Sequence, residues 1–364
     1  MTRPVERVLF LARRFPPSVG GAQMHAHKLY ENLTNLVTVR LVALVRSRLI
    51  HLAWWMPWAL VCALLDLIFN RVDVVYFSDG VTAALATVLR PLTRARFVTS
   101  VYGLELIYGN PVFRVLMRWG IARCEKICVI SQETRRLAEE AGIPAEKIRV
   151  VYLGVETPEM SEDRCRELRA SFEANHGVRF GRDRVLLNIG RQVRRKGVAA
   201  FIEKGAPLLE QDVRMFIGGT GPDHDRIREL IQEKELEGRF EALGFVDDET
   251  AAMLRRSCDL YLMPNVHTPN DVEGYGIAPL EAMSDGLPVV AFAVDALVES
   301  MREGGWLIEA EDYGAFVAKV HEILESTWEE RERMRKEARD YVLREYPWEK
   351  TAREYVAVFE EEGN

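Results

Sequence analysis

Short apolar runs alternate with longer stretches of helical periodicity along the whole chain. In the first half, the apolar runs that predict strands are 7–12, 37–44, 73–77, 96–101, 126–130 and 148–152. In the second half they are 184–189, 213–218, 239–244, 259–263, 288–292 and 305–308. Continuous apolar runs are typical of parallel strands, because helices cover both faces of such a sheet. The pattern therefore predicts an α/β fold with parallel sheets and crossover helices.

The stretch 157–183 is rich in charge and glycine and contains no strong strand pattern. A chain of 364 residues is long for one domain and comfortable for two, so we place the domain boundary in this stretch. The prediction is one Rossmann-like domain over 1–178 and a second over 179–345. One helix ends and another begins near Pro347, and residues 346–364 either extend the second domain or join the first.

Composition narrows the class of protein. The net charge of −7 argues against a general nucleic-acid binder, which would normally have a basic surface. The five cysteines include no C-x-x-C pair, so neither a zinc ribbon nor a dithiol site is indicated. An odd number of cysteines without a pairing framework fits a reducing compartment. The chain shows no signal-peptide pattern, and we expect a cytoplasmic protein.

The stretch EGYGIAPLE, which begins at Glu273 and ends at Glu281, carries the most informative chemistry. Gly274 and Gly276 have no Cβ and allow the backbone to approach a ligand closely. Pro279 suits the first turn of a helix, and the free amides at a helix start suit an anion such as a diphosphate. The alternative is an ordinary surface loop and helix with two solvated glutamates.

The longer passage EGYGIAPLEAMSDGLPVVA resembles the signature of the retaining glycosyltransferases of family 4. These enzymes have the GT-B fold, so the resemblance implies two Rossmann-like domains that face each other across a cleft. It also implies a C-terminal helix that crosses back to the first domain. In this family pattern Glu273 orients the donor sugar and Glu281 holds the ribose. The backbone amides expected to contact the diphosphate are those of Gly274, Tyr275, Gly276 and Ile277.

A basic loop, GRQVRRKG, follows the predicted strand 184–189 and places four cations within six residues. Positive charge gathered on one loop of an acidic protein indicates an anion ligand, and a solvated basic turn is the alternative. The pattern resembles the diphosphate loop of the family, which implies that Arg191 and Lys196 contact the leaving group. We expect Arg194 and Arg195 to face solvent.

Three further loops supply candidate ligand contacts. Gly219 lies in a strand-to-helix turn, and Val246 follows the predicted strand 239–244. The resemblance places Gly219 in the nucleotide pocket and Val246 beside the base. Gly20 and Gly21 follow the first strand, and the resemblance places them near the donor phosphate or the acceptor. Tight packing is the alternative for the glycines, and a buried strand end is the alternative for Val246.

Tyr102 departs from the family pattern. The family usually has a His-Gly pair where this chain has Tyr102 and Gly103, and that histidine contacts the donor sugar. A phenol can donate and accept a hydrogen bond, but it does not titrate near neutrality. Tyr102 is therefore a candidate donor contact that leaves the sugar preference open. His25 and His27 lie about 200° apart on a helix and are not expected to form one site.

The run 49–69 is almost wholly apolar and is long enough to cross a bilayer, although Pro57 divides it. Its three interpretations are a membrane span, a helix buried against the sheet and an interfacial helix. Trp54, Trp55 and Trp58, with arginines near both ends of the run, favour the headgroup zone. One expectation is therefore a peripheral contact with the inner face of a membrane.

The resemblance implies transfer of a hexose-type sugar from a UDP- or GDP-linked donor to a hydroxyl of a glycan or a lipid-linked acceptor. Anomeric configuration is retained in the reaction that it implies. No Asp-x-Asp metal motif is convincingly placed, so we expect neither a metal nor a cofactor besides the donor. Alternatives are another GT-B enzyme, such as a glucan synthase or a nucleotide-sugar epimerase, and a catalytically impaired nucleotide-sugar-binding partner protein. A non-enzymatic membrane adaptor is a further alternative.

Overall fold

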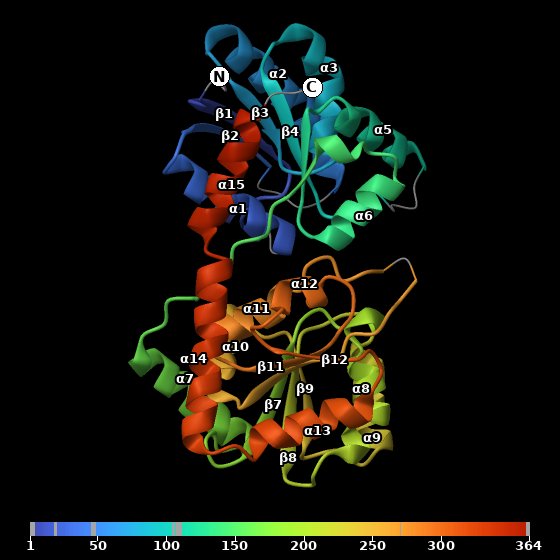
Figure 1. Ribbon diagram of the computed structural model, residues 1–364, viewed down its shortest axis with the longest axis vertical. Helices are drawn as coiled ribbons and strands as arrows, with labels where there is room; N and C mark the ends of the chain where they lie inside the picture. Colours follow the sequence, from blue (N-terminus) through green and yellow to red (C-terminus); the bar gives the residue numbers. More distant parts are fainter. Residues whose placement is uncertain are drawn as a thin grey trace. The chain divides into compact units, whose positions relative to one another are not determined.

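The computed structural model describes residues 4–17, 20–44, 49–103, 106, 111–269 and 271–361. It divides the chain into two compact units, one formed by Met1–Gly154 with Tyr346–Asn364 and the other by Val155–Glu345 (Figure 1). Each unit contains a six-stranded sheet whose neighbouring strands are all parallel. Every predicted strand is present, with ends within two residues of the predicted ones, and the α/β prediction is confirmed.

The sheet of the first unit has the strand order β2-β1-β3-β4-β5-β6. Its strands are β1 (Arg7–Ala12), β2 (Thr38–Ala43), β3 (Val74–Phe77), β4 (Arg96–Val101), β5 (Lys126–Val129) and β6 (Ile148–Val150). Its α-helices are α1 (Gly21–Thr34), α2 (Leu52–Phe69), α3 (Ala86–Leu89), α5 (Pro111–Ala122), α6 (Gln132–Glu140) and α15 (Trp348–Glu360). Short 3₁₀ turns η2 (Thr82–Leu85) and η3 (Arg90–Leu92) flank α3.

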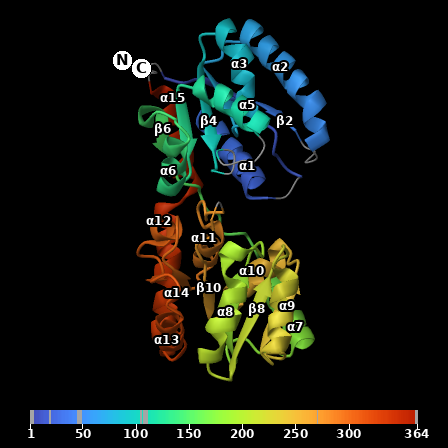
Figure 2. The same cartoon turned by 90° about the vertical axis from the view of Figure 1, so that its right-hand side faces the viewer.

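Helices cover both faces of this sheet (Figure 2). Leu9 and Leu11 of β1 belong to a core that includes residues of α2, α3, α5 and α6. Val8 and Phe10, which point to the opposite face, belong to a core with α1 and α15. Alternate residues of β1 are thus buried on opposite faces, which explains why this strand is apolar after its first residue.

Helix α15 closes the second of these cores. The Tyr355 hydroxyl lies 2.8 Å from Ser100 Oγ, and the Tyr76 hydroxyl lies 2.6 Å from the same oxygen. Gly154 lies so close to Trp348 that a Cβ at position 154 would be 2.4 Å from the Trp348 Cδ2. The C-terminal helix therefore packs within the first unit.

Helix α2 differs from two of our expectations. The helix continues through Pro57, which we predicted would divide the apolar run. Trp54 and Trp58 are exposed, whereas Trp55 is only 1% exposed and packs into the core between α2 and the sheet. Trp55 therefore does not belong to an exposed tryptophan cluster, because neighbouring helical positions point about 100° apart.

The sheet of the second unit has the strand order β12-β11-β10-β7-β8-β9. Its strands are β7 (Arg184–Ile189), β8 (Val213–Gly218), β9 (Phe240–Gly244), β10 (Leu260–Met263), β11 (Val289–Phe292) and β12 (Trp306–Ile308). Its α-helices are α7 (Glu162–His176), α8 (Val198–Lys204), α9 (His224–Glu233), α10 (Asp248–Ser257), α11 (Ile277–Ser284), α12 (Leu297–Met301), α13 (Tyr313–Leu324) and α14 (Trp328–Glu345).

Helix α7 corrects the predicted boundary at residues 178 and 179. Its Phe172 ring lies 5.0 Å from the Phe216 ring of β8, edge to face. The Arg214 guanidinium, also on β8, donates a hydrogen bond to the carbonyl oxygen of His176 at 2.9 Å. Phe172 thus anchors α7 to the second unit, and the division falls between Gly154 and Val155.

Candidate functional site

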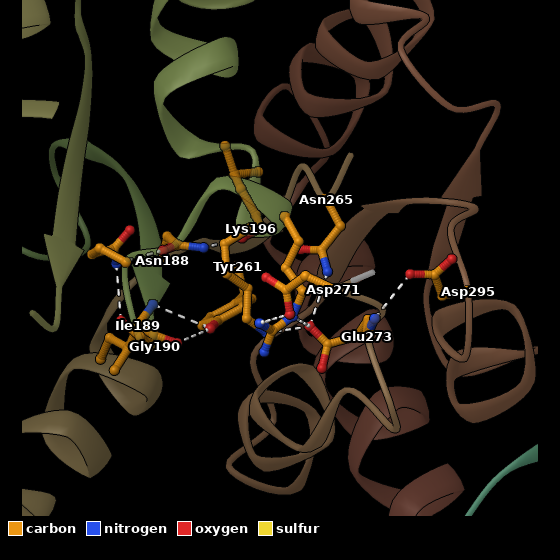
Figure 3. A network of polar contacts seen from close by, with 12 residues as sticks. Asn188, Ile189, Gly190, Lys196, Tyr261, Asn265, Asp271, Glu273 and Asp295 are labelled. Atoms are coloured by element: carbon orange, nitrogen blue, oxygen red, sulfur yellow. Dashed lines mark hydrogen bonds and ion pairs between the residues drawn. The ribbon is translucent and has the colours of Figure 1, made fainter. Parts of the chain in front are cut away.

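The carboxyl ends of the second unit's strands bring together loops that are far apart in the sequence. Because the strands are parallel, the loops after β7, β8, β10 and β11 all leave the sheet at the same edge. The basic loop follows β7, and Glu273 lies between β10 and α11. Figure 3 shows Lys196, Asn265 and Glu273 close together at this edge. The structure therefore brings together the basic loop and the stretch that begins at Glu273, the two parts of the sequence that most strongly indicated ligand binding.

Glu273 is a carboxylate that is only 6% exposed and is surrounded by donors. Its Oε2 accepts hydrogen bonds from Lys196 Nζ at 2.6 Å and from Asn265 Nδ2 at 3.0 Å. The Arg195 Nε lies 3.6 Å from the same oxygen. Burial by itself raises the pKa of Glu273, but Lys196, Arg195 and the two hydrogen bonds outweigh it and lower that pKa below its usual value. Glu273 is therefore ionised at neutral pH, and among the described residues no hydrogen bond reaches its Oε1.

Arg195 does not face solvent, contrary to our prediction. Besides its approach to Glu273, its Nη1 lies 2.8 Å from Asp271 Oδ1. Its side chain is 20% exposed, whereas Arg194 is exposed as predicted. The basic loop therefore contributes two cations, not one, to the surroundings of Glu273.

Gly197 explains why the basic loop turns inward. Its φ is 67°, and a Cβ at this position would lie 1.8 Å from the carbonyl oxygen of Pro264. The 3₁₀ turn η5 (Arg194–Lys196) is thereby held against the loop after β10. The Val266 amide donates to the Arg195 carbonyl oxygen at 2.9 Å. Glycine at 197 is thus required for the contact between the two loops.

Asn265 and Asp295 belong to the site although sequence reasoning did not identify them. Asn265 is 1% exposed, and its Oδ1 has no hydrogen-bond partner among the described residues. Asp295 follows β11, and its Oδ2 accepts a hydrogen bond from the Glu273 amide at 2.9 Å. Its φ of 50° lies in the left-handed region, which is uncommon for residues other than glycine. Only their position in the sequence could have indicated them, since both polar residues follow the ends of apolar strands.

The basic loop also packs against the glycine turn after β8. Gln192 Nε2 donates to the carbonyl oxygens of Gly190 and Gly218, at 3.0 and 2.8 Å. A Cβ at Gly219, whose φ is 108°, would lie 1.9 Å from the Gly190 oxygen. Close packing of two backbones therefore accounts for glycine at 219, and its place in a nucleotide pocket stays a prediction.

Arg191 and Val246 lie in loops that leave the same edge of the sheet. The Arg191 side chain is exposed and forms no hydrogen bond or ion pair within the described part of the chain. Val246 is half-buried, and its Cγ2 would lie 2.9 Å from a Cβ added at Gly218. Arg191 is thus a cation that can still engage an anion from solution.

The predicted helix start after the glycine turn is confirmed. Helix α11 begins at Ile277, after Gly276, which has a φ of 78°. In the loop before it, Gly274 is half-buried and the Tyr275 side chain is 4% exposed. Glu281 lies one turn into the helix, where burial raises its pKa against the opposing charge of Arg255. The two glutamates thus differ, since Glu273 is held ionised and Glu281 is shifted toward its protonated form.

The first unit contains the remaining candidates. Gly20 precedes α1 with a φ of 148°, which favours glycine. Gly21 is exposed, and a Cβ there would meet nothing within 4 Å. Packing therefore does not explain Gly21, and a ligand contact at this helix start stays a prediction.

Tyr102 follows β4 and pairs with a buried histidine. Its hydroxyl lies 2.5 Å from His25 Nδ1. Burial lowers the pKa of His25 to about 3, so this imidazole is neutral at physiological pH. His27 lies 3.3 Å from Glu31 at the surface, and the two histidines are in separate places as predicted. The link between His25 and Tyr102 was not predicted, because the two residues are far apart in the sequence.

Comparison with known proteins decides the family. Residues 172–341 match the model for Glycosyl transferases group 1, and residues 8–159 match the model for Glycosyltransferase Family 4. An uncharacterized glycosyltransferase of Methanocaldococcus jannaschii is 25% identical to this chain over 97% of both proteins. The chain belongs to the group 1 glycosyltransferases.

Solved structures confirm that this glycosyltransferase has the GT-B fold. The catalytic domain of starch synthase IV from Arabidopsis thaliana, bound to ADP and acarbose, superposes with a TM-score of 0.77 at 13% identity. The match covers 98% of this chain and 99% of the plant domain. HepE of Anabaena in complex with UDP gives a TM-score of 0.72 at 18% identity, over 96% and 98% of the two chains.

Group 1 glycosyltransferases of this type transfer a sugar from a nucleotide sugar. In the present glycosyltransferase, Glu273, Lys196, Asn265 and Arg195 form one polar cluster within the second unit. Within the described ranges, no group of three or more His, Cys, Asp or Glu side chains is arranged to hold a metal ion. Metal independence stays a prediction.

Proposed function

We propose that this glycosyltransferase moves a hexose-type sugar from a UDP- or GDP-linked donor to a hydroxyl of a glycan or a lipid-linked acceptor. We further propose that it retains the anomeric configuration and acts without a metal. The observation that carries the proposal is the pairing of Glu273 with Lys196 and Arg195 beside the glycine turn before α11. A carboxylate and two cations at one strand edge suit a ligand that has sugar hydroxyls on one side and phosphates on the other.

The cations would stabilise the leaving nucleoside diphosphate. Negative charge develops on the phosphate oxygen as the bond to the sugar breaks, and preorganised donors at that place lower the barrier. Arg191 is exposed and would contact the diphosphate from the solvent side. Lys196 is buried beside Glu273 and would contact it from the protein side. The amides from Gly274 to Ile277 lie at the start of α11, where backbone N–H groups favour an anion.

Glu273 would hold the sugar. Its Oε2 is engaged by Lys196 and Asn265, which leaves Oε1 to accept a hydrogen bond from a sugar hydroxyl. The unpartnered Asn265 Oδ1 is a second acceptor in the same place. Glu281, one turn into α11, would receive the ribose hydroxyls. Gly219 and Val246 would line the nucleotide, and the contacts of Gly20, Gly21 and Tyr102 with donor or acceptor complete the proposal.

The reaction balances without a separate base. The bond between the anomeric carbon and the phosphate oxygen breaks, and a bond from that carbon to the acceptor oxygen forms on the same face. The acceptor proton passes to the departing phosphate oxygen. Since no side chain has to take this proton, Glu273 can stay ionised throughout, which suits its lowered pKa.

Thermal-shift binding of UDP, GDP and ADP to the wild type, Arg191→Ala and Arg194→Ala tests the nucleotide site. Both arginines are exposed and lie in the same loop, so Arg194→Ala is the matched control for lost charge. We expect one nucleotide to stabilise the wild type and Arg194→Ala, and to stabilise Arg191→Ala much less. No shift with any nucleotide would contradict the proposal, whereas a shift without any donor turnover would favour an impaired partner protein. Consumption of a donor sugar nucleotide without any acceptor, giving an epimerised donor, would favour an epimerase.

A further inference from the structure

Helix α2 has two apolar faces, of which only one is covered. Only three of its 18 residues are buried, Trp55, Ala59 and Ala63, and these pack against the sheet. The opposite side has an exposed stripe at helical spacing, which we call the α2 face. It consists of Trp54, Trp58, Val61, Leu65 and Ile68, with exposed fractions of 52, 47, 53, 50 and 70%. An exposed apolar stripe of this length indicates an interaction surface.

Neighbouring helices on the same side of the sheet add to this apolar surface. Residues of α3 and α5 share a hydrophobic core with α2. On their outer sides Leu92 at the end of η3 is 61% exposed, and Leu116 and Trp119 of α5 are 48% and 57% exposed. The uncovered surface is therefore not limited to a single helix.

The charge of this region is opposite to that of the whole protein. Between residues 40 and 124 the sequence has ten arginines, no lysine and four carboxylates, so the segment carries +6 in a chain of −7. Arg94, Arg118 and Arg123 are exposed on or beside η3 and α5. The Asp66 carboxylate of α2 is paired with Arg40 at 3.4 Å and accepts a hydrogen bond from Asn70. Positive charge beside apolar surface favours an anionic lipid headgroup layer.

The packing of α2 argues against a membrane span. By length and composition α2 could cross a bilayer. A span would, however, remove Trp55, Ala59 and Ala63 from the core that they share with β1 and β3. Strand β3 begins at Val74, five residues after α2 ends, and pairs with β1. The helix therefore stays on the sheet and offers only its outer side.

We propose that the α2 face docks the first unit on the surface of an anionic lipid bilayer. Trp54 and Trp58 would enter the headgroup zone, where tryptophan is favoured, and Val61, Leu65 and Ile68 would contact the outer acyl region. The arginines of η3 and α5 would supply attraction to anionic lipids. A second copy of this chain is a poorer occupant, because it would bring two positively charged surfaces together. The docking does not depend on the proposed transfer reaction.

Vesicle flotation of the full-length protein, without any nucleotide, tests this inference. We expect the wild type to float with vesicles of phosphatidylcholine and phosphatidylglycerol, and to float much less with phosphatidylcholine alone. Binding should fall as salt is raised, because the attraction to headgroups is screened. The double variant Val61→Asp with Leu65→Asp places two carboxylates on the α2 face. Its apparent affinity for the anionic vesicles should fall by roughly tenfold or more, since charged groups are disfavoured in the acyl region.

The matched control is Trp328→Asp with Leu343→Asp, which adds the same charge at two exposed apolar positions of α14. This control should float like the wild type, and thermal unfolding should show that both double variants are folded. The proposal is overturned if the wild type does not float with anionic vesicles, or if the Val61 and Leu65 variant floats equally well. It is also overturned if the wild type is a dimer that does not bind vesicles and the Val61 and Leu65 variant is a monomer. Nucleotide binding by a protein that fails to float would leave the proposed function standing.

Discussion

Lys196 Nζ lies 2.6 Å from Glu273 Oε2, and this buried contact joins residues that are 77 positions apart. Lys196 is 9% exposed and Glu273 is 6% exposed, so the pair links the loop after β7 to the loop before α11 away from solvent. The residue expected to meet the diphosphate is therefore also the main one that lowers the pKa of Glu273, the carboxylate proposed to hold the sugar. One ion pair thus serves both the fold of the second unit and the proposed chemistry.

Replacing Lys196 by Met should destabilise the protein more than replacing both partners. The single variant leaves Glu273 buried with only Arg195 and Asn265 near it, and we expect a loss of about 2–4 kcal/mol in the free energy of unfolding. Adding Glu273→Gln removes the uncompensated charge and should recover part of that loss. Urea unfolding of the wild type, both single variants and the double variant measures the coupling. Additive effects would show that the two side chains do not interact.

His25 should make stability depend on pH below neutrality. Its pKa in the folded protein is about 3, whereas the usual value near 6.5 holds after unfolding. The unfolded chain therefore binds the proton first, and the stability is fully present above about pH 6.5 and is lost as the pH falls toward 3. Between pH 7 and pH 4 the loss from this residue is roughly 3 kcal/mol.

Urea unfolding at several pH values, with the wild type and His25→Gln, checks this expectation. Other groups also titrate in the range, so the quantity that matters is the difference between the two proteins. Glu273 also makes stability fall with pH, but over a more acidic range. Its pKa is lowered by folding, so its contribution is present above about pH 4.3 and is lost in more acidic solution. Equal pH slopes for the wild type and His25→Gln between pH 6.5 and 4.5 would contradict a buried neutral histidine.

Gly276→Ala should lower the stability of the protein by more than the strain of a left-handed alanine alone. A Cβ at position 276 would lie 2.5 Å from Cδ2 of the fully buried Leu297. Gly286 is the matched control, because its φ is 80° against 78° for Gly276 and a Cβ there would have its nearest contact at 3.5 Å. Both alanine variants should lose about 1–2 kcal/mol from the left-handed conformation.

The Gly276 variant should lose about 1–3 kcal/mol more through overpacking, because the start of α11 has to move. It should also bind the nucleotide more weakly, while Gly286→Ala should bind like the wild type. Thermal unfolding and nucleotide titration of both variants provide the comparison. Equal losses of stability would mean that crowding at Leu297 is absent.

Tyr102→Phe should lower stability by about 1–2 kcal/mol, because His25 Nδ1 then loses its buried hydrogen-bond partner. The double variant with His25→Leu removes the polar group as well and should be less destabilised than the two single losses added together. Urea unfolding of the four proteins measures this. A neutral effect of Tyr102→Phe would show that the contact contributes nothing to the fold.

The strands were predictable because they are short and mostly apolar, and β3, β10 and β11 are buried along their whole length. The helix start at Ile277 was predictable for a local reason, since glycine and proline chemistry acts within a few residues. The domain boundary was placed too late because α7 is highly charged, and its contribution to the core rests mainly on Phe172. A single buried aromatic residue in a polar helix gives no periodic signal.

The interior of the site was harder to predict because it depends on contacts between distant loops. Arg195 looked like one more surface cation, but its partners Asp271 and Glu273 lie on a loop more than 70 residues further along the chain. Asn265 and Asp295 belong to no local motif, and their roles follow from the shared edge of parallel strands. Trp55 was grouped with its neighbours because sequence proximity does not show which side of a helix meets the sheet.

The most direct test is donor turnover by the wild type and Glu273→Gln, measured by proton NMR. The donors are hexoses linked to the nucleotide that the thermal-shift panel selects. Glycan and lipid hydroxyl acceptors are supplied together. We expect the wild type to consume the donor and to form a product with the donor's anomeric configuration. Glu273→Gln should turn over on the order of 100-fold more slowly while it binds the nucleoside diphosphate nearly as tightly. Inverted product would contradict the proposed retention of configuration, and undiminished turnover by Glu273→Gln would contradict the central role of this carboxylate.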